Sequence, residues 1–284
     1  FDLFEFHGKN AAIRRALGSW TLLTNTDIFL SDHLAQWLGE HFGSRPQARH
    51  PLDPKKFYRA MRVDMEKPLA SDATVDRFWP QCRASAFRLG RVGWESLRDP
   101  DAHAAFWSSH DALLARWQSG DEAAVQRSLE AKELGLPADL ALQAAGDFTL
   151  LRTDRLLSMR GHPELASYAM HDSALLGCAV ILEAMGQVQL SEPLLLCHQP
   201  HSREKTTSLP PTSAATLFNL MLRRSAYIQP NSEHWGLVNC HLPDEYHWMG
   251  QWHTIVSVDS LEVHCSRDFP LHDDLKSYPF RRFV

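Results

Sequence analysis

A short polar run at 25–27 (NTD) follows the apolar segment 20–24 (WTLLT), and this is the first place where the chain could do chemistry. Turn-forming residues bound the apolar segment, which predicts a buried strand. A carboxylate at the end of such a strand is costly unless a partner compensates its charge. A divalent cation that bridges to a diphosphate would be one such partner, and Lys9 or Arg14 would add positive charge. The alternative is that Asp27 is a turn residue that caps the next segment.

Two further polar residues stand at the ends of predicted elements. Asp172 lies at the start of an apolar helix predicted over 171–185, where the helix dipole stabilises an anion. His198 ends a strand-like run over 194–198, and a neutral imidazole is a good ligand for Mn²⁺ or a similar ion. Each residue also has an ordinary interpretation, as an N-terminal helix cap for Asp172 and as a loop histidine for His198.

The elements that must position these residues alternate along the chain. Strands are predicted over 20–24, 56–63, 147–151, 187–190 and 194–198, and helices over 8–17, 32–42, 154–159, 171–185 and 214–228. Ser31 and Thr153 are the expected N-caps of the helices 32–42 and 154–159. Strands that alternate with helices indicate an α/β fold with a mostly parallel, doubly wound, Rossmann-like sheet. In such sheets ligands bind at the carboxyl ends of the strands, which is where Asp27 and His198 are expected.

Residues 67–145 have a different character, with many Ala, Arg, Trp and Asp residues. Helices are predicted there at 100–118 and 121–134, and no clear strand is present. We interpret this segment as a helical insertion. The chain then divides into a first part of the α/β core over 1–66, the insertion over 67–145, a second part of the core over 146–240, and a C-terminal extension over 241–284, with one alternating run at 254–263.

The run from Lys9 to Leu30 (KNAAIRRALGSWTLLTNTDIFL) resembles glycosyltransferases of the GT-A fold, in the family-2-like group. The shared features are a helix that contains an asparagine, a turn that ends in glycine, an apolar strand and an Asp-x-Asp-type motif. Residues 146–151 (GDFTLL), the turn at 161–164 and the pair His171-Asp172 resemble the second half of the same fold.

This resemblance implies an enzyme that moves a sugar from a nucleotide-sugar donor to a hydroxyl of a carbohydrate or another acceptor, with inversion. Asp27 would bind Mn²⁺ or Mg²⁺, and His198 would complete the metal site. Asp172 would act as the general base on the acceptor hydroxyl. The residues assigned to the donor and its cofactor are Asn10, Arg14, Asn25 and Asp27.

The chain departs from the family pattern at two places. Asn25 replaces the first aspartate of the motif, which shifts metal binding to Asp27. The family begins with a strand–helix–strand unit that grips the nucleotide base, and nothing before Phe1 supplies it. We therefore expect the sequence to be a fragment.

Composition restricts the class of protein. The chain has 284 residues, 44% of them hydrophobic, and a formal net charge of −5, so we expect a globular protein without the basic field that holds nucleic acid. It has no uninterrupted apolar run of about 18 residues, so no transmembrane helix is predicted. Its five cysteines are widely spread and include no C-x-x-C pair. That pattern disfavours a zinc knuckle or a dense disulfide framework and favours a reducing compartment such as the cytoplasm.

Two other functions stay open. A metal-dependent phosphohydrolase would use His162 with the pair His171-Asp172, but its fold is all-helical and the predicted strands count against it. A non-catalytic remnant of a glycosyltransferase would keep the fold as a binding or scaffold protein, because Asn25 and the missing first unit weaken the donor site.

Overall fold

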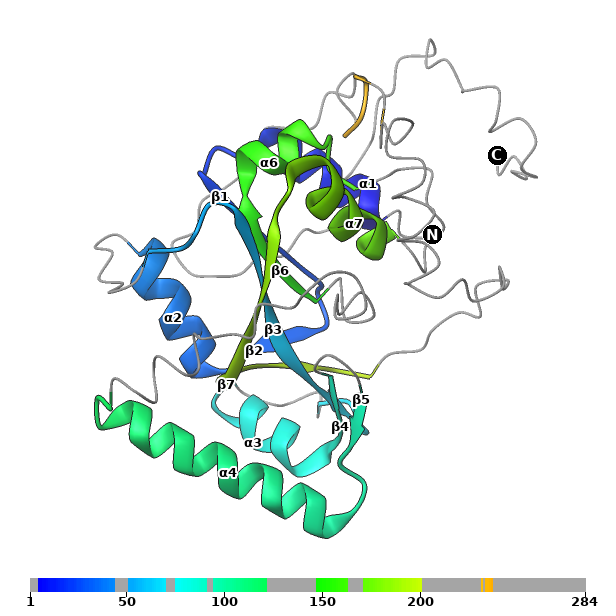
Figure 1. Ribbon diagram of the computed structural model, residues 1–284. Coiled ribbons are helices and arrows are strands. Elements are labelled where there is room, and N and C mark those ends of the chain that lie inside the picture. The colour runs from blue at the N-terminus through cyan, green and yellow to red at the C-terminus, as the bar shows by residue number, and fades with distance from the viewer. Residues whose placement is uncertain are drawn as a thin grey trace, which may run out of the picture.

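The computed structural model of the protein describes residues 5–43, 51–69, 75–90, 94–121, 147–162, 171–200, 231 and 233–236 (Figure 1). The helices are α1 (Glu5–Arg15), α2 (Asp32–Phe42), α3 (Val75–Ser85), α4 (Pro100–Gln118), α6 (Thr153–Ser158) and α7 (His171–Glu183). The strands are β1 (Trp20–Thr24), β2 (Ile28–Leu30), β3 (Lys56–Met65), β4 (Ala86–Gly90), β5 (Trp94–Ser96), β6 (Phe148–Arg152) and β7 (Gly186–His198). Within these ranges no helix is long and apolar enough to cross a bilayer.

One sheet joins all seven described strands, and the long strand β3 runs through it. β3 pairs in parallel with β7, and antiparallel with β6 near Tyr58 and with β4 near its other end. The remaining pairs, β1 with β6, β2 with β7 and β4 with β5, are antiparallel. The α/β class is therefore confirmed, whereas the expectation of a mostly parallel, doubly wound sheet is wrong for the described strands.

The physical reason lies in the connections. A parallel pair needs a long crossover, whereas short turns return the chain antiparallel. Only three residues separate β4 from β5, and this pair is antiparallel as the rule requires. In the other antiparallel pairs a helix or a long stretch of sequence separates the two strands, so their connections allow either direction and tertiary pairing decides it. The hydrophobic pattern located β1, β3, β6 and β7, missed β2, β4 and β5, and carried no information on strand direction.

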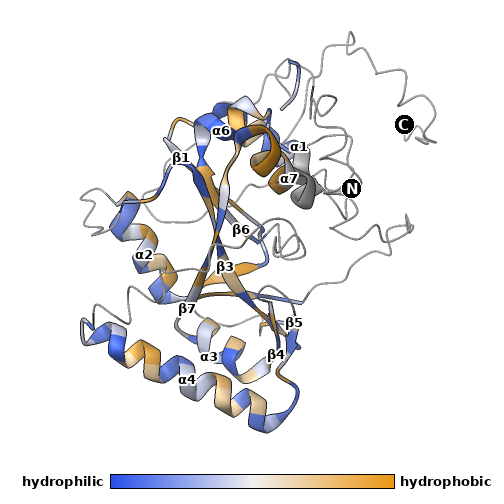
Figure 2. Ribbon diagram, viewed as in Figure 1, coloured by the Kyte–Doolittle hydropathy of each residue, from blue (hydrophilic) through white to orange (hydrophobic). Residues whose placement is uncertain are grey.

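Helices cover the sheet in groups, as Figure 1 shows, with α1, α6 and α7 at one end, α2 at one side and α3 and α4 at the other end. Side chains alternate along β3, so its two faces enter different clusters. Tyr58 and Ala60 pack with Trp37 of α2, whereas Phe57 packs with apolar residues of α1, α6 and α7. The described part of α7 is almost wholly hydrophobic in Figure 2, as a buried helix requires.

Two helices begin with a side-chain N-cap of a residue type that commonly caps helices. Ser31 accepts a hydrogen bond from the backbone N–H of Leu34 and caps α2, as predicted. Asp99 accepts from two backbone N–H groups and Pro100 occupies the first turn of α4, whose bounds match the predicted helix 100–118. The prediction for Thr153 is wrong by one position, because the N-cap of α6 is Arg152, which makes no side-chain cap.

The segment 67–145 is not purely helical. Two of its stretches form strands β4 and β5, which extend the same sheet from β3. These strands are short and β5 has only three residues, so they give little alternation for a pattern to detect. The predicted strands 187–190 and 194–198 are in fact one strand, β7, whose register against β3 shifts between Ala60 and Met61. The predictions for 121–134, 214–228 and 254–263 lie outside the described residues, apart from Asp121.

A disulfide between Cys82 and Cys197 joins α3 to the end of β7, with the two Cα atoms 6.3 Å apart. Both cysteines are buried in the cluster that also holds Val63 and Leu89. Cys178 is a buried free thiol, and burial raises its pKa to about 12. Disulfides are typical of oxidising compartments, so this pair does not favour the reducing compartment that the cysteine pattern predicted, and the compartment stays a prediction. Sequence spacing could not reveal the pair, since 115 positions separate its members.

Replacement of Cys82 and Cys197 by alanine should lower the free energy of unfolding by about 2–5 kcal/mol, because the crosslink restricts the unfolded chain over a long loop. Urea unfolding followed by circular dichroism measures the change. The matched control is dithiothreitol, which should bring the wild type to the stability of the double variant and leave that variant unchanged. A wild type indifferent to the reductant would contradict the prediction.

Candidate functional site

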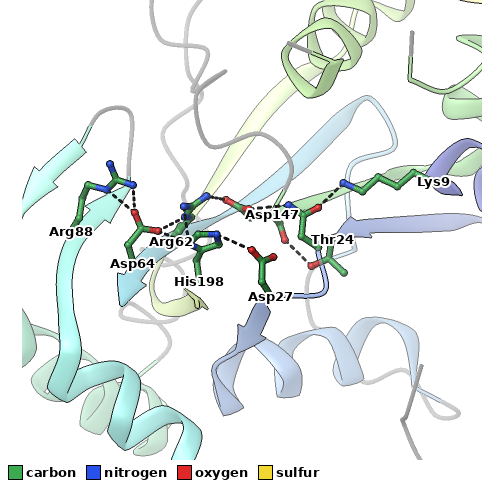
Figure 3. Close-up of polar contacts among 9 residues, drawn as sticks. Lys9, Thr24, Asp27, Arg62, Asp64, Arg88, Asp147 and His198 are labelled. Carbon is green, nitrogen blue, oxygen red and sulfur yellow. Dashed lines mark hydrogen bonds and ion pairs between the residues drawn. The ribbon is translucent and has the colours of Figure 1, made fainter. Parts of the chain in front are cut away.

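Polar side chains from four parts of the sheet meet at one place (Figure 3). The turn between β1 and β2 contributes Asp27, the second half of β3 contributes Arg62 and Asp64, the residue before β6 is Asp147, and β7 ends at His198. Strand register accounts for the meeting. His198 lies opposite Ile28 on one neighbour and opposite Asp64 on the other, and the backbone N–H of Gln199 donates to the carbonyl oxygen of Asp27.

His198 lies between two carboxylates. Its Nε2 is 2.9 Å from Oδ2 of Asp27, and its Nδ1 is 3.1 Å from Oδ1 of Asp64. The structure thus brings together Asp27 and His198, which the sequence assigned to one site from separate motifs. Asp64 is the third member of this chain of contacts, and sequence reasoning missed it.

Arg62 is the centre of the site. Its Nε donates to Oδ1 of Asp64 at 2.5 Å, its Nη1 donates to Oδ2 of Asp147, and its Nη2 is 2.9 Å from Nδ1 of His198. The guanidinium is buried, and so are both of its carboxylate partners. A buried charge needs a partner of opposite sign, and this arrangement supplies one on each side.

Two cationic side chains stand at the ends of this network, as Figure 3 shows. Arg88 of β4 is 38% exposed, and its Nε donates to the buried Oδ2 of Asp64 at 2.6 Å. At the other end, Nζ of Lys9 donates to Oδ1 of Asn25 at 2.6 Å, and the amide nitrogen of Asn25 is 3.4 Å from Oδ1 of Asp147. Lys9 and Asn25 thus join the network through Asp147, and their contribution to a donor site at Asp27 stays a prediction.

The electrostatic environment shifts the pKa values of three groups. Burial alone would raise the pKa of Asp64, but hydrogen bonds from His198 and the charge and hydrogen bonds of Arg62 and Arg88 lower it to about 2. Burial alone would lower the pKa of His198, yet its hydrogen bonds to Asp27 and Asp64 outweigh burial and raise it. Burial also opposes the charge of Arg62, and its two carboxylate partners more than compensate, so its pKa is raised.

Asn10 and Arg14 lie in a second cluster and contact backbone. The side-chain amide of Asn10 is fully buried; it donates to the carbonyl oxygen of His162 and accepts from the N–H of the same residue. Gly161 has φ +69°, and a Cβ there would lie 2.3 Å from Oδ1 of Asn10, so this turn needs glycine. Nη1 of Arg14 donates to the carbonyl oxygens of Glu233 and Trp235. These contacts explain both residues structurally, by the docking of segments 160–162 and 233–236 onto α1.

Asp172 lies in the first turn of α7, as the sequence predicted. Its side chain lies outside the described part of the structure, so its role as general base stays a prediction. The neighbouring candidate His162 is buried, and its backbone is held by Asn10 and by Asn231.

The sequence assigned a divalent cation to Asp27 and His198. Among the described residues no three His, Cys, Asp or Glu side chains are arranged as a complete cation site. An oxygen and a nitrogen ligand 2.9 Å apart are close enough to bind one ion such as Mn²⁺, whose shell substrate phosphates and water would complete. The residues present therefore fit a cation that arrives with its substrate.

No protein family, curated protein or solved structure was found to match this chain.

The Arg62→Met variant should lose about 3–5 kcal/mol of unfolding free energy, because two buried carboxylates lose their counter-charge. Urea unfolding at neutral pH measures the loss. Arg83→Met is the matched control, since the pair of Arg83 with Asp111 is exposed and is expected to contribute less than about 1 kcal/mol. Equal losses of unfolding free energy in the two variants would show that the buried ion pairs of Arg62 stabilise the fold no more than an exposed pair does.

The low pKa of Asp64 predicts acid sensitivity with a defined sign. A carboxyl group whose folded pKa is about 2 against 3.8 unfolded stabilises the fold above pH 3.8, and this contribution disappears as the pH falls toward 2. We expect about 2 kcal/mol from this group. Urea unfolding at descending pH should show the wild type losing more stability than Asp64→Asn, which lacks the titrating group. If the unfolding free energies of the two proteins fell equally as the pH was lowered, Asp64 would not contribute to acid sensitivity.

Proposed function

We propose that this protein is a glycosyltransferase that moves a sugar from a nucleotide-sugar donor to an acceptor hydroxyl. The observation that carries the proposal is the contact of Asp27 with His198, whose facing atoms are 2.9 Å apart. The resemblance to family-2-like GT-A enzymes assigns these two residues to the divalent cation at the donor diphosphate. Their convergence from distant parts of the chain is what such a site requires, and the parallel pair β3–β7 is the part of the sheet that agrees best with that fold.

Charge balance at the site supports an anionic substrate. Three aspartates, Asp27, Asp64 and Asp147, would together repel a diphosphate. Arg62 and Arg88 neutralise two of them through direct contacts. A diphosphate that approached Asp27 would therefore meet one carboxylate rather than three, beside the positive charge of Lys9 held on Asn25.

Asp27 and His198 would hold Mn²⁺ or Mg²⁺ in this proposal. When bound, the cation would stabilise the negative charge on the leaving diphosphate. Asn25, in place of the first aspartate of the family motif, would contribute an amide rather than a charge.

Asp172 is the proposed general base, a role that rests on the resemblance. It would take the proton from the acceptor hydroxyl while the sugar is transferred with inversion.

The two other candidate functions differ in their support. The phosphohydrolase alternative called for an all-helical fold, and the seven-stranded sheet counts against it. A non-catalytic remnant would keep the Asp27–His198 contact and bind a nucleotide without turnover. Release of UDP or GDP from a sugar nucleotide, measured with an acceptor mixture, would favour the enzyme over the remnant.

The Asp27→Asn variant should bind UDP or GDP in the presence of Mn²⁺ at least about 10-fold more weakly than the wild type, because a metal-ligating charge is lost. Isothermal titration calorimetry measures both affinities, with and without Mn²⁺. Asp111→Asn carries the same substitution on the exposed face of α4 and should bind like the wild type. Equal Mn²⁺-dependent binding by Asp27→Asn and the wild type would remove Asp27 from the site.

A further inference from the structure

We propose that Asp64 is a positioning residue for His198: it accepts a hydrogen bond from Nδ1–H and so keeps Nε2 as the ring atom that faces Asp27. Nothing in the sequence motifs assigned a role to Asp64. The meaning of this arrangement rests on the proposed function, since a cation would replace the hydrogen between Nε2 and Asp27. The arrangement itself can be tested without any ligand.

The contacts around the imidazole ring define the question. Nε2 has Asp27 at 2.9 Å, whereas Nδ1 has two neighbours, Oδ1 of Asp64 at 3.1 Å and Nη2 of Arg62 at 2.9 Å. If Nδ1 carries hydrogen, it donates to Asp64. If it carries a lone pair, it accepts from Arg62, and the ring hydrogen must then lie on Nε2.

Charge favours the hydrogen bond to Asp64. A lone pair on Nδ1 would lie 3.1 Å from a carboxylate oxygen in a place where the side chain of Asp64 is only 2% exposed, so solvent would screen the repulsion poorly. Arg62 does not need the ring as an acceptor, because its Nε and Nη1 already donate to Asp64 and Asp147. Nε2 lies 2.9 Å from Oδ2 of Asp27, so the ring has a carboxylate acceptor on each side.

Asp64 is itself held firmly enough to orient the ring. One oxygen accepts from Arg62, the other accepts from Arg88, and the register of β3 with β7 places Asp64 directly opposite His198. Asp27, by contrast, is 18% exposed and lies on a turn. The two carboxylates thus have different tasks: the buried one fixes the orientation of the ring, and the more exposed one lies on the side from which a substrate would come.

Nitrogen-15 NMR of the metal-free protein labelled at histidine tests the proposal directly. In the wild type the Nδ1 resonance of His198, assigned by comparison with His198→Gln, should be that of a protonated nitrogen, coupled to a slowly exchanging ring N–H. In Asp64→Asn the carboxylate acceptor is lost and the amide can donate to Nδ1, so the ring should lose its hydrogen at Nδ1 and carry one only on Nε2. Asp147→Asn removes the same charge from the other partner of Arg62 and should leave the Nδ1 resonance unchanged.

The wild-type spectrum alone can overturn the proposal, whether or not Asp64→Asn folds. A His198 ring that carries its hydrogen only on Nε2 would show that Arg62, and not Asp64, is the partner of Nδ1. An unchanged ring in a folded Asp64→Asn protein would also overturn it.

A second measurement separates this inference from the proposed function. Mn²⁺-dependent binding of UDP or GDP, measured by calorimetry, should weaken about 10–100-fold in Asp64→Asn and much less in Asp147→Asn. If the wild type binds neither nucleotide, the proposed function fails while the NMR result still decides the role of Asp64. If Asp64→Asn binds as tightly as the wild type, the positioning role fails and the proposed function stands.

Discussion

The buried guanidinium of Arg62 is the constraint on which the rest of the site depends. It contacts Asp64, Asp147 and His198, which belong to three different segments of the chain, and all of these groups are largely removed from water. Charges in such a place are tolerated only when each one has a partner at close range. The ends of β3, the entry to β6 and the end of β7 must therefore come together for any of these groups to be buried. Loss of one partner would leave a buried charge without a counter-charge, which would destabilise the folded state.

Strand β3 explains how the sheet can hold this polar group beside an apolar core. Its two faces alternate, so Arg62 and Asp64 continue the face of Tyr58 and Ala60, while Met61 and Val63 enter the apolar cluster on the other face. The disulfide of Cys197 lies in that second cluster, one residue before His198. The disulfide therefore ties β7 to α3 next to the site, and the parallel pairing of β3 with β7 fixes Arg62 and Asp64 relative to His198. A rigid base of this kind suits a site whose ligands must keep their relative positions.

Local pattern was sufficient for several elements and for part of the site. The apolar run of β1, the capped helices α2 and α4 and the start of α7 were predicted within a few residues, because each has a signal contained within its own segment. Asp27 was singled out because a carboxylate at the end of a buried strand is costly without a partner, and His198 because the resembling family can complete its metal site with a histidine after this strand. Arg62 and Asp64 were missed, although their spacing of two within an apolar strand places both on one face, and that spacing was a usable signal. Asn10 and Arg14 were assigned to a ligand, whereas their contacts hold the backbone at His162, Glu233 and Trp235.

The sequence by itself determined the α/β class, most of the strands and helices near the site, and two side chains that meet in it, because these depend on short-range periodicity and capping. Only the tertiary structure decided the direction of the strands, the incorporation of β4 and β5 into the sheet, the Cys82–Cys197 pair and the network around Arg62. The physical reason is that strand pairing, crosslinks and ion pairs join residues far apart along the chain. Their energies depend on distances and burial that no local window of sequence contains.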